Sequence, residues 1–264
     1  MKIGFIGCGN MASAMIQGMK NSGLAKAEDM IASAKSENTK KKIRQELGIQ
    51  AADSNGQVAD TAEIVFLAVK PQFLEGVLEE IKNRVRPGQI FVSIAPGKTL
   101  AWLGERLGED TKIIRTMPNT PAMVGAGMTG LCVNANVTEK ETELVCSLMD
   151  TFGKTEIVPE SLMDVVVGVS GSSPAYVFMF LEAMADAAVA DGMPRAQAYK
   201  FAAQSVMGSA KLMLETGKHP GELKDMVCSP AGTTIEAVRV LEEKGLRSAV
   251  IEAQKACVKK AKGM

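Results

Sequence analysis

A glycine-rich turn close to the start of the chain has the pattern of a phosphate-binding turn. Gly7-Cys8-Gly9-Asn10-Met11-Ala12 fits G-x-G-x-x-A, follows the apolar run Lys2–Ile6 and precedes a helical pattern. The first glycine allows a tight turn, the second lets the backbone approach a pyrophosphate, and the small third residue lets helix and strand pack closely. Unpaired N–H groups at the helix N-terminus would face the anion. We therefore predict a dinucleotide-binding site formed by Ile6, Gly7, Cys8, Gly9, Asn10 and Met11.

The residues at the end of the second predicted strand indicate which dinucleotide is bound. NAD-preferring sites usually end this strand with Asp or Glu, which holds the ribose 2′-hydroxyl. Here the chain reads Ala32-Ser33-Ala34-Lys35-Ser36, without an acid. The hydroxyls of Ser33 and Ser36 and the charge of Lys35 or Lys40 would suit a 2′-phosphate, although these lysines could also form a solvated helix face. We expect NADPH to be preferred, with NADH as a usable alternative.

A second group of residues, far along the chain, suits a carboxylate. Ser229-Pro230-Ala231-Gly232-Thr233-Thr234 precedes a predicted helix. Small residues with free N–H groups and hydroxyls at a helix start can hold a carboxylate. The alternative is an ordinary helix cap, since Ser and Thr are preferred at that position anyway. We favour substrate contact, made by Ser229, Ala231, Gly232, Thr233 and Thr234.

Other residue types that commonly carry chemistry are few. There is one histidine, His219, and the five cysteines are scattered without a C-x-x-C pair. We therefore expect no metal site, and we interpret the cysteines as reduced thiols of a cytosolic protein. The thirty basic residues balance thirty acidic ones, which gives no sign of a nucleic-acid partner. The N-terminal sequence lacks the layout of a secretion signal.

The elements that would position these residues follow two different patterns. Up to Val158, apolar strands and helices alternate about every 25 residues, which predicts βαβ units and a mostly parallel sheet. The expected strands are Lys2–Ile6, Met30–Ser33, Ile64–Val69, Ile90–Ile94, Lys112–Arg115 and Gly130–Val133. From Leu162 the pattern is helical throughout. We predict an α/β Rossmann-like dinucleotide-binding domain at residues 1–160 and an all-α domain at 161–264, with dimerisation and substrate binding in the latter.

The predicted helix Pro174–Ala190 is apolar on nearly every side and must therefore be covered on every side. Glu182 and Asp186 interrupt it, so it falls short of a convincing membrane span. A helical domain of about 100 residues can hardly bury such a helix alone. We predict a subunit partner packed against it; the alternative is the central helix of a self-sufficient bundle.

Five sequence blocks together resemble the pyrroline-5-carboxylate reductase family, over the whole chain. In order they are FIGCGNMA at 5–12, FLAVKPQ at 66–72, RTMPNTP at 115–121, GSSPAY at 171–176, and HPGELKD at 219–225 with SPAGTT at 229–234. Two positions depart from the family pattern. Ser173 and Ala231 stand where the family commonly has glycine, and each change alters the backbone freedom of the site.

The resemblance implies an NADPH-dependent reductase that converts 1-pyrroline-5-carboxylate to L-proline. It also implies cofactor contacts from Asn55, Ala68, Lys70 and Pro71, and it makes Thr234 the side chain that donates a hydrogen bond or relays a proton to the ring nitrogen. The RTMPNTP block is expected to shape the site rather than to react. The family further implies a homodimer through the helical domain, which can assemble into larger rings, with each site completed by a neighbouring subunit.

Three other functions stay open on the sequence. A broader cyclic imine or ketimine reductase would share nearly everything except the fit of the substrate. A β-hydroxyacid dehydrogenase would look to a catalytic lysine after the glycine-serine motif, and the segment Tyr176–Met193 contains none. A non-catalytic NADP-binding sensor would not need the block at 229–234.

Overall fold

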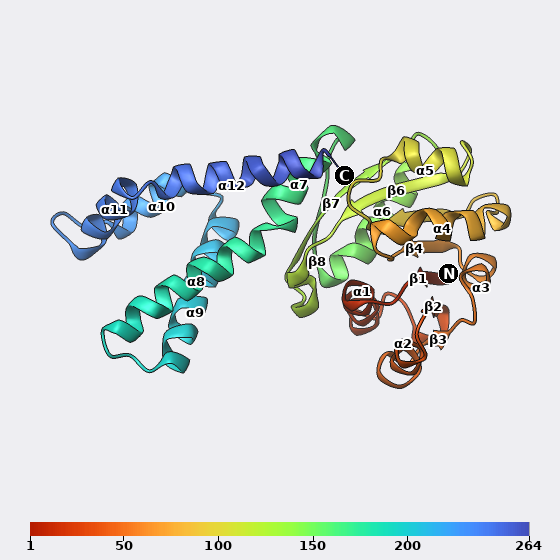
Figure 1. Cartoon of the computed structure of the whole chain (residues 1–264), viewed down its shortest axis with the longest axis horizontal. Helices are drawn as coiled ribbons and strands as arrows, with labels where there is room; N and C mark the ends of the chain where they lie inside the picture. Colours follow the sequence, from red (N-terminus) through yellow and green to blue (C-terminus); the bar gives the residue numbers. More distant parts are fainter. Residues whose placement is uncertain (264) are drawn as a thin grey trace. The chain divides into compact units, whose positions relative to one another are not determined.

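The computed structural model describes residues 1–263 and divides them into two compact units (Figure 1). The first unit runs from Met1 to Ser172 and takes in the residues from Cys257 onward, and the second is Ser173–Ala256. These limits differ from the division at residues 160 and 161 that we expected from the sequence. The change of secondary structure does fall where the sequence indicates it, because no strand follows Ile157 within residues 1–263.

One eight-stranded sheet organises the first unit, in the order β3-β2-β1-β4-β5-β6-β7-β8 (Figure 1). The strands are β1 (Ile3–Ile6), β2 (Met30–Ser33), β3 (Gln50–Ala51), β4 (Ile64–Leu67), β5 (Ile90–Ser93), β6 (Lys112–Met117), β7 (Gly127–Val133) and β8 (Gly153–Ile157). Strands β1 to β6 run parallel to one another, whereas β7 lies antiparallel to β6 and β8 is parallel to β7. The predicted Rossmann-like fold with a mostly parallel sheet is confirmed.

The helices follow the alternation expected from the sequence. In the first unit they are α1 (Asn10–Asn21), α2 (Glu37–Lys42), α3 (Asn55–Thr61), α4 (Pro71–Ile81), α5 (Leu100–Leu107), α6 (Glu139–Met149) and α7 (Met163–Val166). The others are α8 (Ser173–Ala190), α9 (Arg195–Thr216), α10 (Pro220–Val227), α11 (Thr233–Glu243) and α12 (Leu246–Ala261), of which α12 ends in residues of the first unit.

The sheet is buried on both faces, as a parallel sheet requires. Side chains at alternate strand positions point to opposite faces, so Phe5 and Ile6 of β1 enter different cores. Phe5 stacks on Phe66 of β4, with ring centroids 4.9 Å apart, in the core that contains Met15 of α1. Ile6 belongs to the core that contains Leu74 of α4. This double coverage explains why β4 reads as an uninterrupted apolar run.

The strand order creates a crevice at the carboxyl ends of β1 and β4. The chain passes from β1 to β2 on one side and later returns to β4 on the other side of β1. Open α/β sheets bind ligands where the strand order reverses in this way. The residues that follow these two strands, from Gly7 and from Ala68, therefore lie at the edge of the sheet where a dinucleotide is expected.

The second unit is made of helices, and α8 and α9 pack along each other (Figure 1). Ala185 is the one buried residue of α8, and several large apolar side chains of that helix are exposed: Val177, Phe178, Met179 and Phe180. The continuous helical segment 160–190 is long and apolar enough to cross a membrane by length and composition alone. Apolar helices that are covered by other parts of a protein can have the same length and composition.

Candidate active site

Gly7 makes a turn that no other residue could make without strain. Its φ is +91°, in the region that favours glycine. A Cβ atom at this position would lie 2.8 Å from the carbonyl oxygen of Ala68 and 2.8 Å from Cγ1 of Val69. The close approach of β1 to the residues after β4 thus depends on the missing side chain, as the glycine pattern predicts.

Gly9 leaves the N-terminus of α1 open. It stands at the N-cap with φ −83°, and no side chain caps the first N–H groups of the helix. A Cβ atom at Gly9 would meet no other atom within 4 Å. By contrast, Ser36, Ser54, Thr99 and Thr138 cap α2, α3, α5 and α6 with their hydroxyls. The free N–H groups of α1 and the space beside Gly9 suit a pyrophosphate.

Cys8 lies between these glycines but faces the protein. Its side chain is buried, and Sγ lies 4.0 Å from Oγ of Ser13. Burial raises the pKa of the Cys8 thiol, so the thiol is uncharged at neutral pH. No negative charge is therefore placed beside the anion that the turn would hold.

A cleft of about 580 Å³ extends from the glycine turn across the ends of β2 and β4. Its lining residues come from the first unit and are Gly7, Ser33, Ala34, Lys35, Lys40, Asp53, Ser54, Asn55, Val69, Phe73, Gly76, Val77 and Glu80. The volume is of the size that small-molecule sites usually have. The lining is mainly polar at the end of β2 and mainly apolar along α4.

A chain of hydrogen bonds crosses one end of this cleft. The hydroxyl of Ser33 donates to Oδ1 of Asn55 over 2.6 Å, and Nδ2 of Asn55 donates to Oε2 of Glu80 over 2.7 Å. Ser33 is buried and Asn55 half-buried, while Glu80 is exposed. The three side chains, from β2, α3 and α4, thereby form one connected group.

Both signs of charge line the same end of the cleft. Lys35 is exposed and forms no ion pair within residues 1–263, whereas Nζ of Lys40 lies 3.1 Å from Oε1 of Glu37. Asp53 and Glu80 contribute carboxylates. The end of β2 therefore lacks an acid, as the sequence indicates, but acids from other segments reach the cleft.

The predicted cofactor residues are divided between the cleft and its supports. Four of them line the cleft: Gly7, Ser33, Lys35 and Asn55. The others lie elsewhere around the turn. Ile6 and Cys8 are buried, Ala68 is half-buried, and Met11 packs against the core that contains Phe5. Asn10 borders a shallow hollow beside α1. Lys70 is the N-cap residue of α4, and Pro71 is the first residue of that helix. Ser36 caps α2 by accepting from the N–H of Thr39, so its hydroxyl already has a partner.

The sequence reasoning missed one wall of the cleft, which α4 provides. Phe73, Gly76, Val77 and Glu80 lie three or four residues apart and so share one face of the helix. That spacing was visible in the sequence. It could have indicated the wall, because α4 directly follows the strand at the crevice.

The RTMPNTP block, which begins inside β6, connects segments of the first unit. Arg115 is buried, with a guanidinium nitrogen 3.1 Å from Oε1 of Glu160 and another 3.6 Å from Oδ1 of Asp164. The buried Asn119 donates to the carbonyl oxygen of Ser170 over 3.0 Å and accepts from the N–H of Met128 over 2.8 Å. These side chains thus connect residues 115–119 to residues 128, 160–164 and 170.

The segment 229–234 of the second unit forms a tight turn before α11. Ala231 has φ +55°, a left-handed conformation that costs a residue with a Cβ atom roughly 1–2 kcal/mol. A Cβ atom at Gly232 would lie 2.3 Å from Oγ of Ser229 and 3.1 Å from its carbonyl oxygen, so a side chain at this position would require the Ser229 hydroxyl to turn away. Gly232 is the N-cap of α11, and no side chain caps that helix. The ordinary helix cap considered as an alternative is therefore not formed, and Thr233 and Thr234 begin a helix whose first N–H groups are open.

His219, the one histidine, has a local structural role. Its Nδ1 accepts a hydrogen bond of 3.0 Å from the N–H of Gly221 and so caps α10. The ring is thereby engaged at a helix start.

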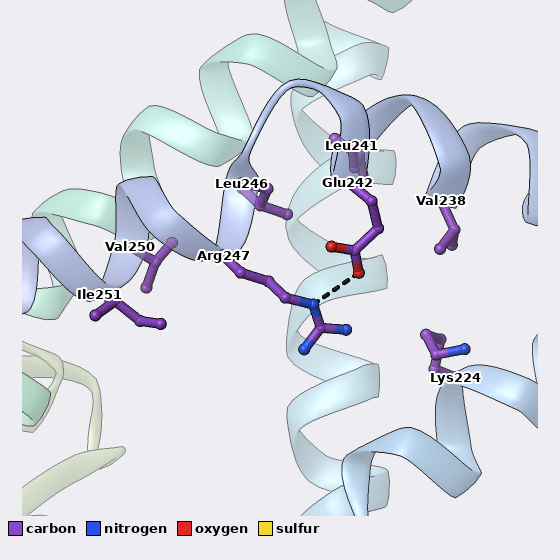
Figure 2. Close-up of a pocket in the computed structure, with 8 residues that line it drawn as sticks. All are labelled: Lys224, Val238, Leu241, Glu242, Leu246, Arg247, Val250 and Ile251. Carbon is purple, nitrogen blue, oxygen red and sulfur yellow. Dashed lines mark hydrogen bonds and ion pairs between the residues drawn. The ribbon is translucent and has the colours of Figure 1, made fainter.

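A groove of about 490 Å³ in the second unit has different chemistry (Figure 2). It is lined by Lys224, Val238, Leu241, Glu242, Leu246, Arg247, Val250 and Ile251. Nε of Arg247 donates to Oε1 of Glu242 over 2.7 Å, and apolar side chains of α11 and α12 lie on either side of this pair (Figure 2). None of its lining residues belongs to the segment 229–234. An apolar hollow of this kind suits a protein surface better than a small acid.

Comparison with known proteins gives consistent matches over the whole chain. Residues 160–264 match the family described as pyrroline-5-carboxylate reductase dimerisation, and residues 2–97 match NADP oxidoreductase coenzyme F420-dependent. The chain is 57% identical to the pyrroline-5-carboxylate reductase of Escherichia coli K12, over 98% of this chain and 97% of that one.

Solved structures agree with these matches. A pyrroline-5-carboxylate reductase from Coxiella burnetii is 35% identical, with a TM-score of 0.93 over 99% of this chain and 97% of that one. The Plasmodium falciparum pyrroline carboxylate reductase with NADP bound is 30% identical, with a TM-score of 0.90 over 100% of this chain and 97% of that one.

Proposed function

The chain belongs to the pyrroline-5-carboxylate reductase family, and on this basis we propose that it reduces 1-pyrroline-5-carboxylate to L-proline with NADPH as its preferred cofactor and NADH as a second. As a member of that family it is an NAD(P)H-dependent oxidoreductase that acts on a C=N bond. The observation that carries the proposal is the open N-terminus of α1 behind Gly9, two residues after Gly7, which lines a cleft that also contains Lys35.

The residues of this cleft fit a dinucleotide. The N–H groups after Gly9 would hold the pyrophosphate, and Gly7 keeps the turn tight enough for this contact. Lys35 and the Ser33–Asn55 pair would receive the 2′ end of the adenosine ribose. When bound, the reduced nicotinamide supplies the hydride for the C=N bond. In this assignment residues 1–160 form the dinucleotide-binding domain.

The segment Ser229–Thr234 would hold the substrate carboxylate. The N-terminus of α11 is uncapped, and Gly232 leaves its first N–H groups accessible. A carboxylate at such a helix end gains from the helix dipole and from several N–H donors. Residues 161–264 would accordingly combine substrate binding with dimerisation.

The protonated imine already carries the proton that the reduction needs at nitrogen. The chain therefore needs a hydrogen-bond acceptor for that N–H group, which orients the ring, rather than a strong acid, and positioning and exclusion of water would do most of the catalytic work. Thr234, half-buried at the start of α11, is the side chain we assign to this role.

Replacing Thr234 with Ala should lower kcat by about tenfold to a hundredfold, because a hydrogen bond to a charged group is lost. The dissociation constant of NADPH should not change. Thr234→Ser keeps the hydroxyl and is the matched control, which should retain most of the activity. Steady-state kinetics with both variants checks this, and equal turnover by Thr234→Ala and the unaltered chain would remove Thr234 from the mechanism.

The substrate assignment is tested by comparing related substrates. We expect NADPH oxidation with 1-pyrroline-5-carboxylate at a kcat/KM about tenfold or more above that with the six-membered piperideine analogue, since one methylene group is commonly discriminated to this extent. Open-chain keto acids with amines should react more slowly still. A chain that accepted all three equally would be a broader imine reductase, and one that bound NADPH but oxidised it with none would be a sensor.

The second unit supports an oligomer. Large apolar side chains are exposed on α8 and α9, and residues 160–264 match a dimerisation family. We propose a homodimer through these helices, with larger rings built from it and with each active site completed by a neighbouring subunit. This contact would cover α8 with protein. All five cysteines are free thiols, which supports a cytoplasmic location.

A further inference from the structure

We infer that Glu80 of α4 is a specificity-determining residue, which weakens the selection of 2′-phosphorylated over 2′-hydroxyl dinucleotides. This inference rests on the proposed binding of the dinucleotide in the cleft of the first unit. The end of β2 has no acid, but a carboxylate of α4 lines the same cleft. This carboxylate, of Glu80, accepts a hydrogen bond from the side-chain amide of Asn55.

The direction of the hydrogen bonds follows from the chemistry of the three side chains. An ionised carboxylate can only accept, so Asn55 must turn Nδ2 toward Glu80, over 2.7 Å. Oδ1 of Asn55 then faces Ser33, whose hydroxyl must donate to it, over 2.6 Å. Glu80 therefore fixes the orientation of both neighbours.

This orientation presents acceptors to the cleft. The hydroxyl hydrogen of Ser33 is engaged, so Oγ offers its lone pairs. The second carboxylate oxygen of Glu80 has no hydrogen-bond partner among residues 1–263. A ribose 2′-hydroxyl, which donates, matches such a surface. A 2′-phosphate needs donors, so it would have to break the chain of hydrogen bonds and would also meet a negative charge.

Glu80 has no cation that would neutralise this effect. Glu80 forms no ion pair within the described part of the chain, whereas a carboxylate oxygen of the adjacent Glu79 lies 2.6 Å from Nζ of Lys82, and Glu79 does not line the cleft. Because Glu80 is exposed, water and salt screen its charge, and its influence on a bound phosphate is expected to be moderate.

The test uses two variants that each remove one negative charge from α4. Glu80→Gln can still accept from Nδ2 of Asn55 through its amide oxygen while offering an N–H donor to the cleft. Glu79→Gln is the matched control, one residue away and outside the cleft. Calorimetry would measure the dissociation constants of 2′,5′-ADP and 5′-AMP, which differ in the 2′-phosphate, for the full-length chain and both variants.

We expect the affinity ratio of 2′,5′-ADP to 5′-AMP to rise about fivefold to tenfold in Glu80→Gln at low salt, from removal of a like charge near the phosphate. The ratio should stay unchanged in Glu79→Gln, and the gain should shrink in high salt. An unchanged ratio in Glu80→Gln, or an equal rise in both variants, overturns the role of Glu80 and leaves the proposed function intact. If the unaltered chain bound neither nucleotide, the dinucleotide site itself would be wrong.

Discussion

Gly7→Ala is expected to lower the affinity for NADPH by about a hundredfold or more and to destabilise the first unit by about 2–3 kcal/mol. Alanine at φ +91° is strained, and its Cβ atom would press on the carbonyl group of Ala68 at 2.8 Å. The turn would have to move away from the residues after β4, which would displace the N-terminus of α1. Fluorescence titration with NADPH and urea unfolding measure the two effects.

Gly9→Ala separates binding from folding. Its φ of −83° suits any residue, and the added methyl group meets no protein atom within 4 Å, so the stability should fall by less than about 1 kcal/mol. NADPH affinity should still fall about tenfold or more, because the methyl group enters the space beside the open helix end. If both variants bound NADPH as well as the unaltered chain, the pyrophosphate would not lie on this turn.

Arg115→Ala should lower the stability of the first unit by about 2–3 kcal/mol, less than for a fully buried ion pair, because the side chains of Glu160 and Asp164 are 32% and 27% exposed. The guanidinium group is buried between Glu160 and Asp164, which would keep their charges without a cation. Arg84→Ala is the control: Arg84 and Asp60 are about half exposed, and such a pair contributes about 0–1 kcal/mol. Urea midpoints at a fixed protein concentration provide the comparison.

A double variant tests whether the lost ion pair causes the fall in stability. Adding Glu160→Gln to Arg115→Ala removes one of the two uncompensated charges and should recover part of the lost stability. Additive losses in the two single variants and the double variant would mean that the ion pair has little coupling, and that Arg115 contributes through its packing alone.

The sequence predicted the buried strands because their signal is local. Ile64–Leu67 is apolar at every position, and both faces of β4 are covered by helices. The short strand β3 and the edge strand β8 carry no such run; Gly153–Ile157 reads GKTEI and is half-exposed or exposed. α5 was missed although Thr99 caps it and Leu100, Leu103 and Leu107 share a face, so this helix could have been predicted.

The direction of β7 was not evident from the sequence. The predicted strands ended at Arg115 and began at Gly130, a gap long enough for a crossover to a parallel strand. In the structure β6 ends at Met117 and β7 begins at Gly127. The segment 118–126 between them is too short for that crossover. β7 therefore returns antiparallel to β6. A few residues at each strand end decided the topology.

The site was predictable where it is built from consecutive residues and not where distant segments meet. The turn at residues 7–9 can be read from its glycines, because each has a fixed geometric task. The group Ser33, Asn55 and Glu80 joins three elements, and their proximity follows only from the strand order around β1. For the same reason, the absence of an acid on β2 was visible while the acid of α4 was not.

The buried thiols bear on how the chain would respond to oxidants. Burial, with a further contribution from Glu160, raises the pKa of Cys132 to about 11, and burial raises that of Cys8 as well. Peroxide and alkylating reagents attack the thiolate, so both sulfurs are slow targets at neutral pH. The nucleotide turn is thus protected from chemical damage by the packing that shapes it.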